Sequence, residues 1–150
     1  MELLGARPHF RAELQAKLGQ RRFAPEEIEA ALDRLAAQGY LDDRATARRF
    51  VQARSEGRGE GRHRLRGELL KRGVAPGLAD EVLAELLPED DRAAAAEAAA
   101  RFLRSGRKSP DALARHLARK GFSRRAIVAL LRELPEGPEV DDADLGPDPE

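Results

Sequence analysis

The chain repeats one apolar pattern three times, and this repeat limits its possible folds more than any other feature. The first copy consists of Leu14, Leu18, Phe23, Ile28, Leu32 and Leu35. Adding 51 to these numbers gives Leu65, Leu69, Val74, Ala79, Leu83 and Leu86, and adding 99 gives Leu113, Leu117, Phe122, Ile127, Leu131 and Leu134. Ala79 is the one weakly apolar member. This register predicts three copies of one small structural unit.

Within each copy the spacing predicts two short helices, because apolar residues recur one turn apart on either side of a break. Gly73 and Gly121 suit the left-handed position that ends a helix. Pro25 and Pro76 suit the first turn of the next helix, where a missing N–H costs nothing. Helix starts are also expected at Ser109 and Ser123.

A third helix is expected after the pair in the first two copies, at about residues 42–56 and 89–104. Its inward side chains would be Ala47, Phe50 and Val51 in the first copy, and Ala99, Phe102 and Leu103 in the second. The sequence thus predicts eight helices. It also predicts four segments, namely a first repeat at 1–56, a second at 57–105, a two-helix third repeat at 106–134 and an acidic tail at 135–150.

The composition predicts an all-α protein. The chain has 27 Ala and 21 Leu but only 5 Val, 2 Ile and 1 Thr, so a sheet has almost none of the residues that favour it. Units of this size bury little apolar surface alone, and we therefore expect the repeats to stack into an elongated, curved array. The tail is rich in Pro, Gly and acids, and we expect it to be disordered.

Charge divides the chain into a basic body and an acidic tail. Residues 135–150 carry seven acids and no base, which leaves the rest of the chain with a net charge of +7. Two clusters stand out: residues 54–72 contain seven bases and three acids, and residues 101–125 contain nine bases and one acid. A solvated helix face is the ordinary interpretation of one such cluster. Two clusters favour a nucleic acid or an acidic protein groove as partner.

Few residues suit catalysis. Cysteine is absent, which excludes disulfides, thiolate catalysis and cysteine-based zinc sites. His9, His63 and His116 lack the spacing of a helical metal site, and we expect all three to be solvated. The Gly-rich loop at 57–61 follows a helical segment, so a flexible linker explains it better than a phosphate-binding loop. We therefore expect no enzymatic activity, no metal and no cofactor.

The N-terminal sequence lacks the layout of a signal peptide, and no apolar run approaches the roughly 20 residues that span a bilayer. We therefore expect a cytoplasmic protein without a membrane partner. The composition does not fix the oligomeric state, and we take a monomer as the working expectation.

Several motifs together resemble the RecX family of bacterial regulatory proteins. They are Arg11 with Glu13-Leu14, the Gly-Tyr-Leu-Asp-Asp sequence at 39–43, and Gly59 and Gly61 ahead of Arg64 and Glu68-Leu69. The resemblance covers roughly residues 3–134. It departs from the family pattern at Ala45-Thr46, where an aromatic residue is usual, and at Arg62, where proline is usual. It implies tandem three-helix repeats.

The resemblance also implies a function: binding the RecA filament on DNA and restraining its recombinase, ATPase and co-protease activities in recombination and the SOS response. Partners would be RecA and single-stranded DNA, with double-stranded DNA left open. The alternative is a helical DNA-binding module that acts without RecA. The candidate contact residues form two patches: Arg54, Arg58, Arg62, Arg64, Arg66, Lys71 and Arg72 in the first, and Arg115, Arg119, Lys120, Arg124 and Arg125 in the second.

Overall fold

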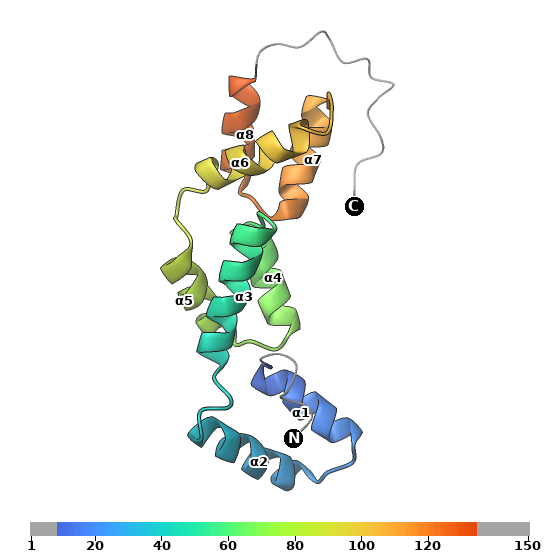
Figure 1. Ribbon diagram of the computed structural model, residues 1–150, viewed down its shortest axis with the longest axis vertical. Coiled ribbons are helices and arrows are strands. Elements are labelled where there is room, and N and C mark those ends of the chain that lie inside the picture. Colours follow the sequence, from blue (N-terminus) through green and yellow to red (C-terminus); the bar gives the residue numbers. More distant parts are fainter. Residues whose placement is uncertain (1–8, 135–150) are drawn as a thin grey trace. The chain divides into compact units, whose positions relative to one another are not determined.

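The computed structural model describes residues 9–134, which form eight α-helices and no strand (Figure 1). The helices are α1 (Arg11–Gln20), α2 (Pro25–Ala37), α3 (Asp43–Gly57), α4 (Arg62–Lys71), α5 (Pro76–Leu86), α6 (Arg92–Leu103), α7 (Pro110–Lys120) and α8 (Arg124–Glu133). The prediction of an all-α fold with repeated helices is confirmed. The acidic tail at 135–150 lies outside the described residues.

The helix ends follow the local signals in the sequence. Gly73 and Gly121 adopt the left-handed conformation, with φ of 84° and 95°, where glycine carries no steric penalty. Pro25 and Pro76 open α2 and α5. The Ser109 hydroxyl accepts a hydrogen bond from the Ala112 amide at 3.1 Å, and Ser123 caps α8 in the same way.

The three hydrophobic cores group the helices differently from the sequence repeat. Leu14, Leu32 and Leu35 form a core between α1 and α2. A second core joins α3 to α4 and α5, and a third joins α6 to α7 and α8. Each third helix of the sequence repeat therefore packs with the helix pair that follows it. The predicted segment boundaries at 56 and 105 remain a prediction.

Two apolar positions differ from the sequence interpretation. Phe23 was expected in the core but is 49% exposed, and Leu103 was expected to point inward but is 36% exposed. The counterparts of Phe23 in the other two copies are buried, with Val74 at 2% and Phe122 at 5% exposed. Ala79 is fully buried despite its small side chain. The register therefore identifies equivalent positions, while burial depends on what lies next to each copy.

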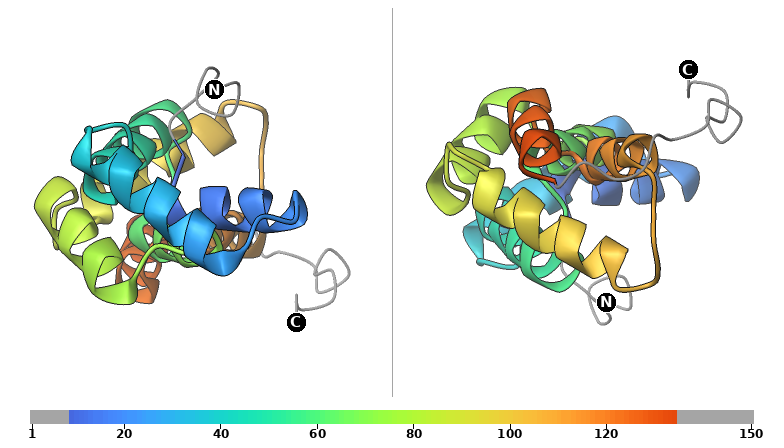
Figure 2. Two further views of the ribbon diagram at one scale, coloured as in Figure 1. Left: turned by 90° about the horizontal axis from the view of Figure 1, so that it is seen from below. Right: turned by 90° about the horizontal axis from the view of Figure 1, so that it is seen from above.

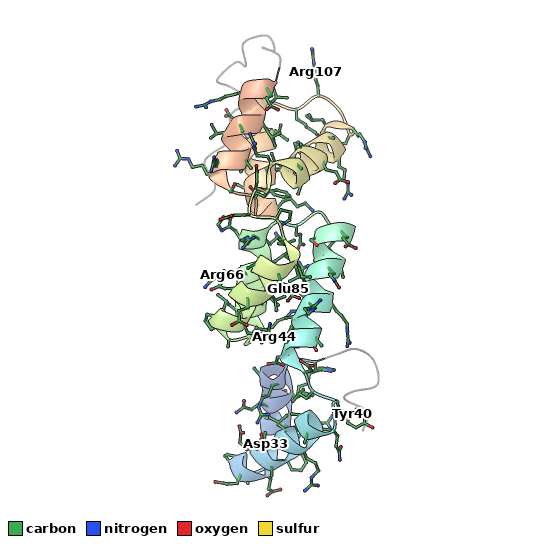
Figure 3. The ribbon with its side chains drawn as sticks, turned by 90° about the vertical axis from the view of Figure 1, so that its left-hand side faces the viewer. Asp33, Tyr40, Arg44, Arg66, Glu85 and Arg107 are labelled. Carbon is green, nitrogen blue, oxygen red and sulfur yellow. The ribbon has the colours of Figure 1, made fainter. Side chains whose placement is uncertain are left out.

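The chain forms two compact units. The first contains residues 9–58 and 65–87, and the second contains residues 59–64 and 88–134, so the first turn of α4 belongs to the second unit. In the first unit α3 and α5 lie side by side and are joined by the ion pairs Arg44–Glu81 and Arg48–Glu85 (Figure 3). In the second unit α6 packs against α7 and α8 (Figure 2).

Candidate functional site

In the second unit the turn between α7 and α8 holds the start of α4. The Gly61 amide donates to the Lys120 carbonyl at 2.6 Å, and the His63 amide donates to the Gly121 carbonyl at 3.1 Å. These bonds satisfy amides that a helix start leaves without an intrahelical partner. The backbones approach so closely that a Cβ on Gly61 would lie 2.6 Å from the Gly121 oxygen. Glycine at both positions makes this contact possible.

This contact brings together residues from both predicted patches. The Arg64 guanidinium donates to the Arg119 carbonyl at 3.1 Å, although the two residues are 55 positions apart. Arg64 also lies 3.3 Å from the carboxylate of Glu60, whose side chain is 3% exposed. We call the basic residues around this turn the turn cluster; its members are Arg62, Arg64, Arg115, Arg119, Lys120, Arg124 and Arg125.

Part of the turn cluster is directed to solvent without a hydrogen-bonded internal partner. Arg119, Arg124 and Arg125 are exposed, and their side chains form no hydrogen bond or ion pair within residues 9–134. Arg125 is near enough to Asp90 to contribute to the lowered pKa of that carboxyl, which the Arg92 amide lowers most. The start of α8 is fixed by Asp91, which accepts 2.7 Å hydrogen bonds from both the amide and the hydroxyl of Ser123. Arg124 and Arg125 therefore follow a helix start that is held in place, and they are suited to bind an anion.

His116 lies beside the turn cluster in α7. Its ring stacks on Phe102, with centroids 4.1 Å apart and an angle of 11° between the planes. Burial lowers the pKa of His116, and the positive charges of Lys120 and Arg119 lower it further. The prediction of a solvated side chain is therefore wrong for His116. It is also wrong for His9, which is 5% exposed and lies 3.0 Å from the Lys17 ammonium.

Several members of the first predicted patch stabilise the first unit instead. Arg66 pairs with Asp80 at 2.7 Å and thereby links α4 to α5. Arg54 lies 3.8 Å from Glu68, and the guanidinium groups of Arg54 and Arg72 lie 4.9 and 4.7 Å from the Phe50 ring centroid.

The members of the first patch are divided between the two compact units. Arg54, Arg58, Arg66, Lys71 and Arg72 belong to the first unit, whereas Arg62 and Arg64 belong to the second. Arg58 and Lys71 are exposed, at the end of α3 and the end of α4. The Arg62 guanidinium lies 3.4 Å from the Pro88 carbonyl, which is also in the second unit.

Sequence reasoning missed two groups that position the helices. Asp43 lies within the Gly-Tyr-Leu-Asp-Asp motif, and its carboxylate accepts from the Arg11 amide at 2.8 Å and so caps α1. The ammonium of Lys108 lies 5.5 Å from the centroid of the Phe102 ring, which also carries the His116 stack. Neither contact leaves a signal in residue spacing, because each joins segments whose approach depends on tertiary packing.

Within the described part of the chain, no group of three or more His, Asp or Glu side chains is arranged to hold a metal ion. None of the helices between residues 9 and 134 is long and apolar enough to cross a membrane.

Comparisons with known proteins match this architecture. The model of the RecX first three-helix domain matches residues 1–35, and that of the RecX second three-helix domain matches residues 42–83. A regulatory protein RecX from Prosthecochloris aestuarii is 36% identical over 135 residues, which cover 87% of each chain. The chain belongs to the RecX family. The match to the second family domain covers α3, α4 and most of α5, the helices that share the second core.

Other relatives extend the comparison. A regulatory protein RecX from Thermus thermophilus is 51% identical over 89 residues, a match that spans 59% of this chain and 58% of that protein. The crystal structure of RecX from Lactobacillus salivarius has a TM-score of 0.76 at 19% identity, and it covers 88% of this chain and 89% of that one. At this identity the structural likeness shows the shared fold.

Proposed function

We propose that this RecX-family chain binds the RecA filament on DNA and lowers the recombinase, ATPase and co-protease activities of RecA. Through these activities it would restrain recombination and the SOS response in the cytoplasm. The role is regulatory and requires no catalytic group or cofactor of its own. Family membership supports the partner, and the turn cluster supports the mode of contact.

The observation that carries the mode of contact is the set of exposed cations at the α7–α8 turn. Arg119, Arg124 and Arg125 have no hydrogen-bonded or ion-paired acid within the described residues, so their guanidinium groups can bind a partner without breaking an internal bond. Arginine forms strong bidentate contacts with carboxylates and phosphates. Acidic loops of RecA and DNA phosphates are both suitable partners for these groups.

The test is the rate of ATP hydrolysis by RecA on single-stranded DNA, with the chain added at increasing ratios to RecA. A steep loss of rate well below one chain per RecA protomer is expected for a protein that binds or caps the filament. Loss only at ratios that coat the DNA would contradict filament binding. That outcome would favour a DNA-binding module that acts without RecA, a candidate supported by the same exposed cations.

A double charge reversal locates the contact. Arg124→Glu with Arg125→Glu should raise the protein concentration needed for half-inhibition by about tenfold or more, because charged hydrogen bonds contribute about 1.5–3 kcal/mol each. The matched control is Arg34→Glu with Arg49→Glu, which makes the same change in net charge at exposed positions of α2 and α3. An equal loss of inhibition in both variants would overturn the assignment to the turn cluster.

DNA binding without RecA is measured separately, with labelled single-stranded and double-stranded DNA at several salt concentrations. Phosphate contacts make affinity fall steeply with salt, by a slope that reflects the number of phosphates neutralised. A smaller slope for the Arg124→Glu and Arg125→Glu variant than for its control is expected if these side chains contact phosphate. An unchanged slope would assign them to the RecA protein surface instead.

A further inference from the structure

The three helix pairs are each joined by a turn that contains one residue with positive φ, and one of the three turns is unlike the others. The left-handed residues in these turns are Arg22, Gly73 and Gly121, with φ of 64°, 84° and 95°. Arg22 is the one non-glycine residue with positive φ among residues 9–134. A left-handed backbone costs an ordinary residue roughly 1–2 kcal/mol, so glycine would be the easier choice at position 22.

In two of the three turns the glycine is required by a neighbour. A Cβ on Gly73 would overlap the Cβ of Ala12 in the first turn of α1. A Cβ on Gly121 would lie 2.6 Å from the Cβ of Arg64 in the first turn of α4. The turn of one helix pair thus docks onto the helix start of the preceding pair, at a distance that only glycine allows. The following residues, Val74 and Phe122, are buried at these contacts.

The turn at residues 21–23 has no preceding helix pair among the described residues. Phe23 is 49% exposed, and Arg21 and Arg22 are exposed beside it. The start of α7 corresponds in the repeat register to the starts of α1 and α4. Within residues 9–134, however, no later helix pair supplies a turn that packs against it. At this helix start Pro110 has no N–H, and Ser109 accepts from the Ala112 amide through its hydroxyl and from the Leu113 amide through its carbonyl.

We propose that the Arg21–Phe23 turn is a repeat-docking surface that Arg22 keeps closed, and that its fitting partner is the start of α7 in a second copy of this chain. In the repeat register Asp111 corresponds to Ala12 and His63, and Ala112 corresponds to Glu13 and Arg64. These two residues of the second copy would therefore meet the Arg21–Phe23 turn. Asp111 is exposed and acidic and can pair with the basic Arg21 or Arg22, whereas the exposed Arg107 and Lys108 precede the same helix start. The Cβ of Arg22 occupies the space into which that helix start would have to move.

The consequence of an open surface would be growth without limit. A contact between the first turn of one copy and the last helix pair of the next is heterologous, and such contacts produce filaments when they do not close into rings. Arg22 therefore keeps single copies apart, at the cost of a strained backbone.

The experiment compares Arg22→Gly with Arg21→Gly by sedimentation equilibrium from micromolar to millimolar concentration. Both variants lose one exposed arginine from the same turn, but only position 22 has the left-handed backbone. The wild-type chain and Arg21→Gly should keep the mass of one copy throughout. Arg22→Gly should show a weight-average mass that rises with concentration and exceeds twice that of one copy at the millimolar end.

A second variant tests the partner surface. Adding Asp111→Arg to Arg22→Gly places a positive charge opposite Arg21, and this double variant should return to the mass of one copy. Thermal unfolding at or above the wild-type midpoint shows that each variant is folded. A folded Arg22→Gly chain that stays at the mass of one copy would overturn the proposal, as would association of Arg21→Gly to the same extent. Undiminished association of the double variant would overturn the assignment to α7.

Discussion

The α3–α5 helices of the first unit and the α7–α8 pair of the second use arginine in opposite ways. In the first unit arginines join helices, since Arg44, Arg48 and Arg66 all pair with acids on α5. In the second unit α7 and α8 carry one acid each, Asp111 and Glu133, and exposed arginines outnumber them. The difference teaches that the acids on neighbouring helices, more than the density of basic residues, decide which arginines can bind a partner.

The largest expected effect comes from removing the contact that joins the two predicted patches. Gly121→Ala places a Cβ 2.6 Å from the Arg64 Cβ and forces a left-handed backbone on alanine. We expect the free energy of unfolding to fall by about 2–4 kcal/mol, which urea denaturation would measure.

Gly67→Ala is the matched control for this change. Gly67 lies within α4 and has no atom within 4 Å of its would-be Cβ, so alanine should raise stability by about 0.5–1 kcal/mol. A Gly121→Ala chain as stable as wild type would show that the turn can move away from α4. The close approach of the two backbones would then not be what positions Arg64.

A smaller effect is expected when the ion pairs between α3 and α5 are reversed. Arg44→Glu with Arg48→Glu should lower the free energy of unfolding only slightly, because exposed pairs contribute little individually. Adding Glu81→Arg and Glu85→Arg restores opposite charges across the helices and should recover most of the loss.

The same reversal in the second unit should act on binding instead of stability. Arg124→Glu with Arg125→Glu breaks no hydrogen bond or ion pair in the described residues, and the unfolding free energy should stay within about 0.5 kcal/mol of wild type. A loss as large as that in the α3–α5 variant would mean that these arginines also stabilise the fold, and the contrast between the units would fail.

The smallest effect concerns pH. The pKa of His116 is lowered in the folded chain by burial and by Lys120 and Arg119, so the unfolded chain binds more protons just below the ordinary value of about 6.5. Stability contributed by neutral His116 is complete above that value and should decrease as the pH falls through the folded pKa. Urea unfolding of wild type and His116→Gln between mildly acidic and neutral pH measures this change.

His63→Gln is the control for the pH experiment, because His63 is exposed and lies outside the stack that His116 forms with Phe102. This variant should retain the pH dependence of wild type, and His116→Gln should lose part of it. The opposite pattern would contradict the role of the positive charges beside His116.

The sequence was sufficient for most of the helix ends, which depend on local chemistry. Gly73, Gly121, Pro25 and Pro76 occupy the helix ends expected of them, since these residue types have few other favourable positions. The helix at about 42–56 was placed within one residue of α3 at both ends. The residues alone favoured a nucleic acid or an acidic protein groove as partner, and only the resemblance to a family suggested RecA.

What the sequence could not give depends on which segments become neighbours. Phe23 shares its register with Val74 and Phe122, yet it is exposed because no helix start among the described residues covers it. Arg54 and Arg66 have the same charge as Arg124, but they form ion pairs with acids on adjacent helices. Burial and pairing are properties of tertiary contacts, and a one-dimensional pattern contains them only indirectly.

The way the three cores group the helices has a consequence for gene rearrangement. A recombination crossover near residue 41 or 88 would transfer α3–α5 with Leu65, Leu69 and Leu83 still together, and it would separate only Phe10 from the buried members of their core. A crossover near residue 57 would follow the sequence repeat but separate Val51 from the leucines that surround it. Chimeras between relatives should therefore tolerate exchange near residue 41 or 88 far better than near residue 57. The inherited unit of such proteins would then begin with α3, which is the third helix of the first repeat in the sequence register.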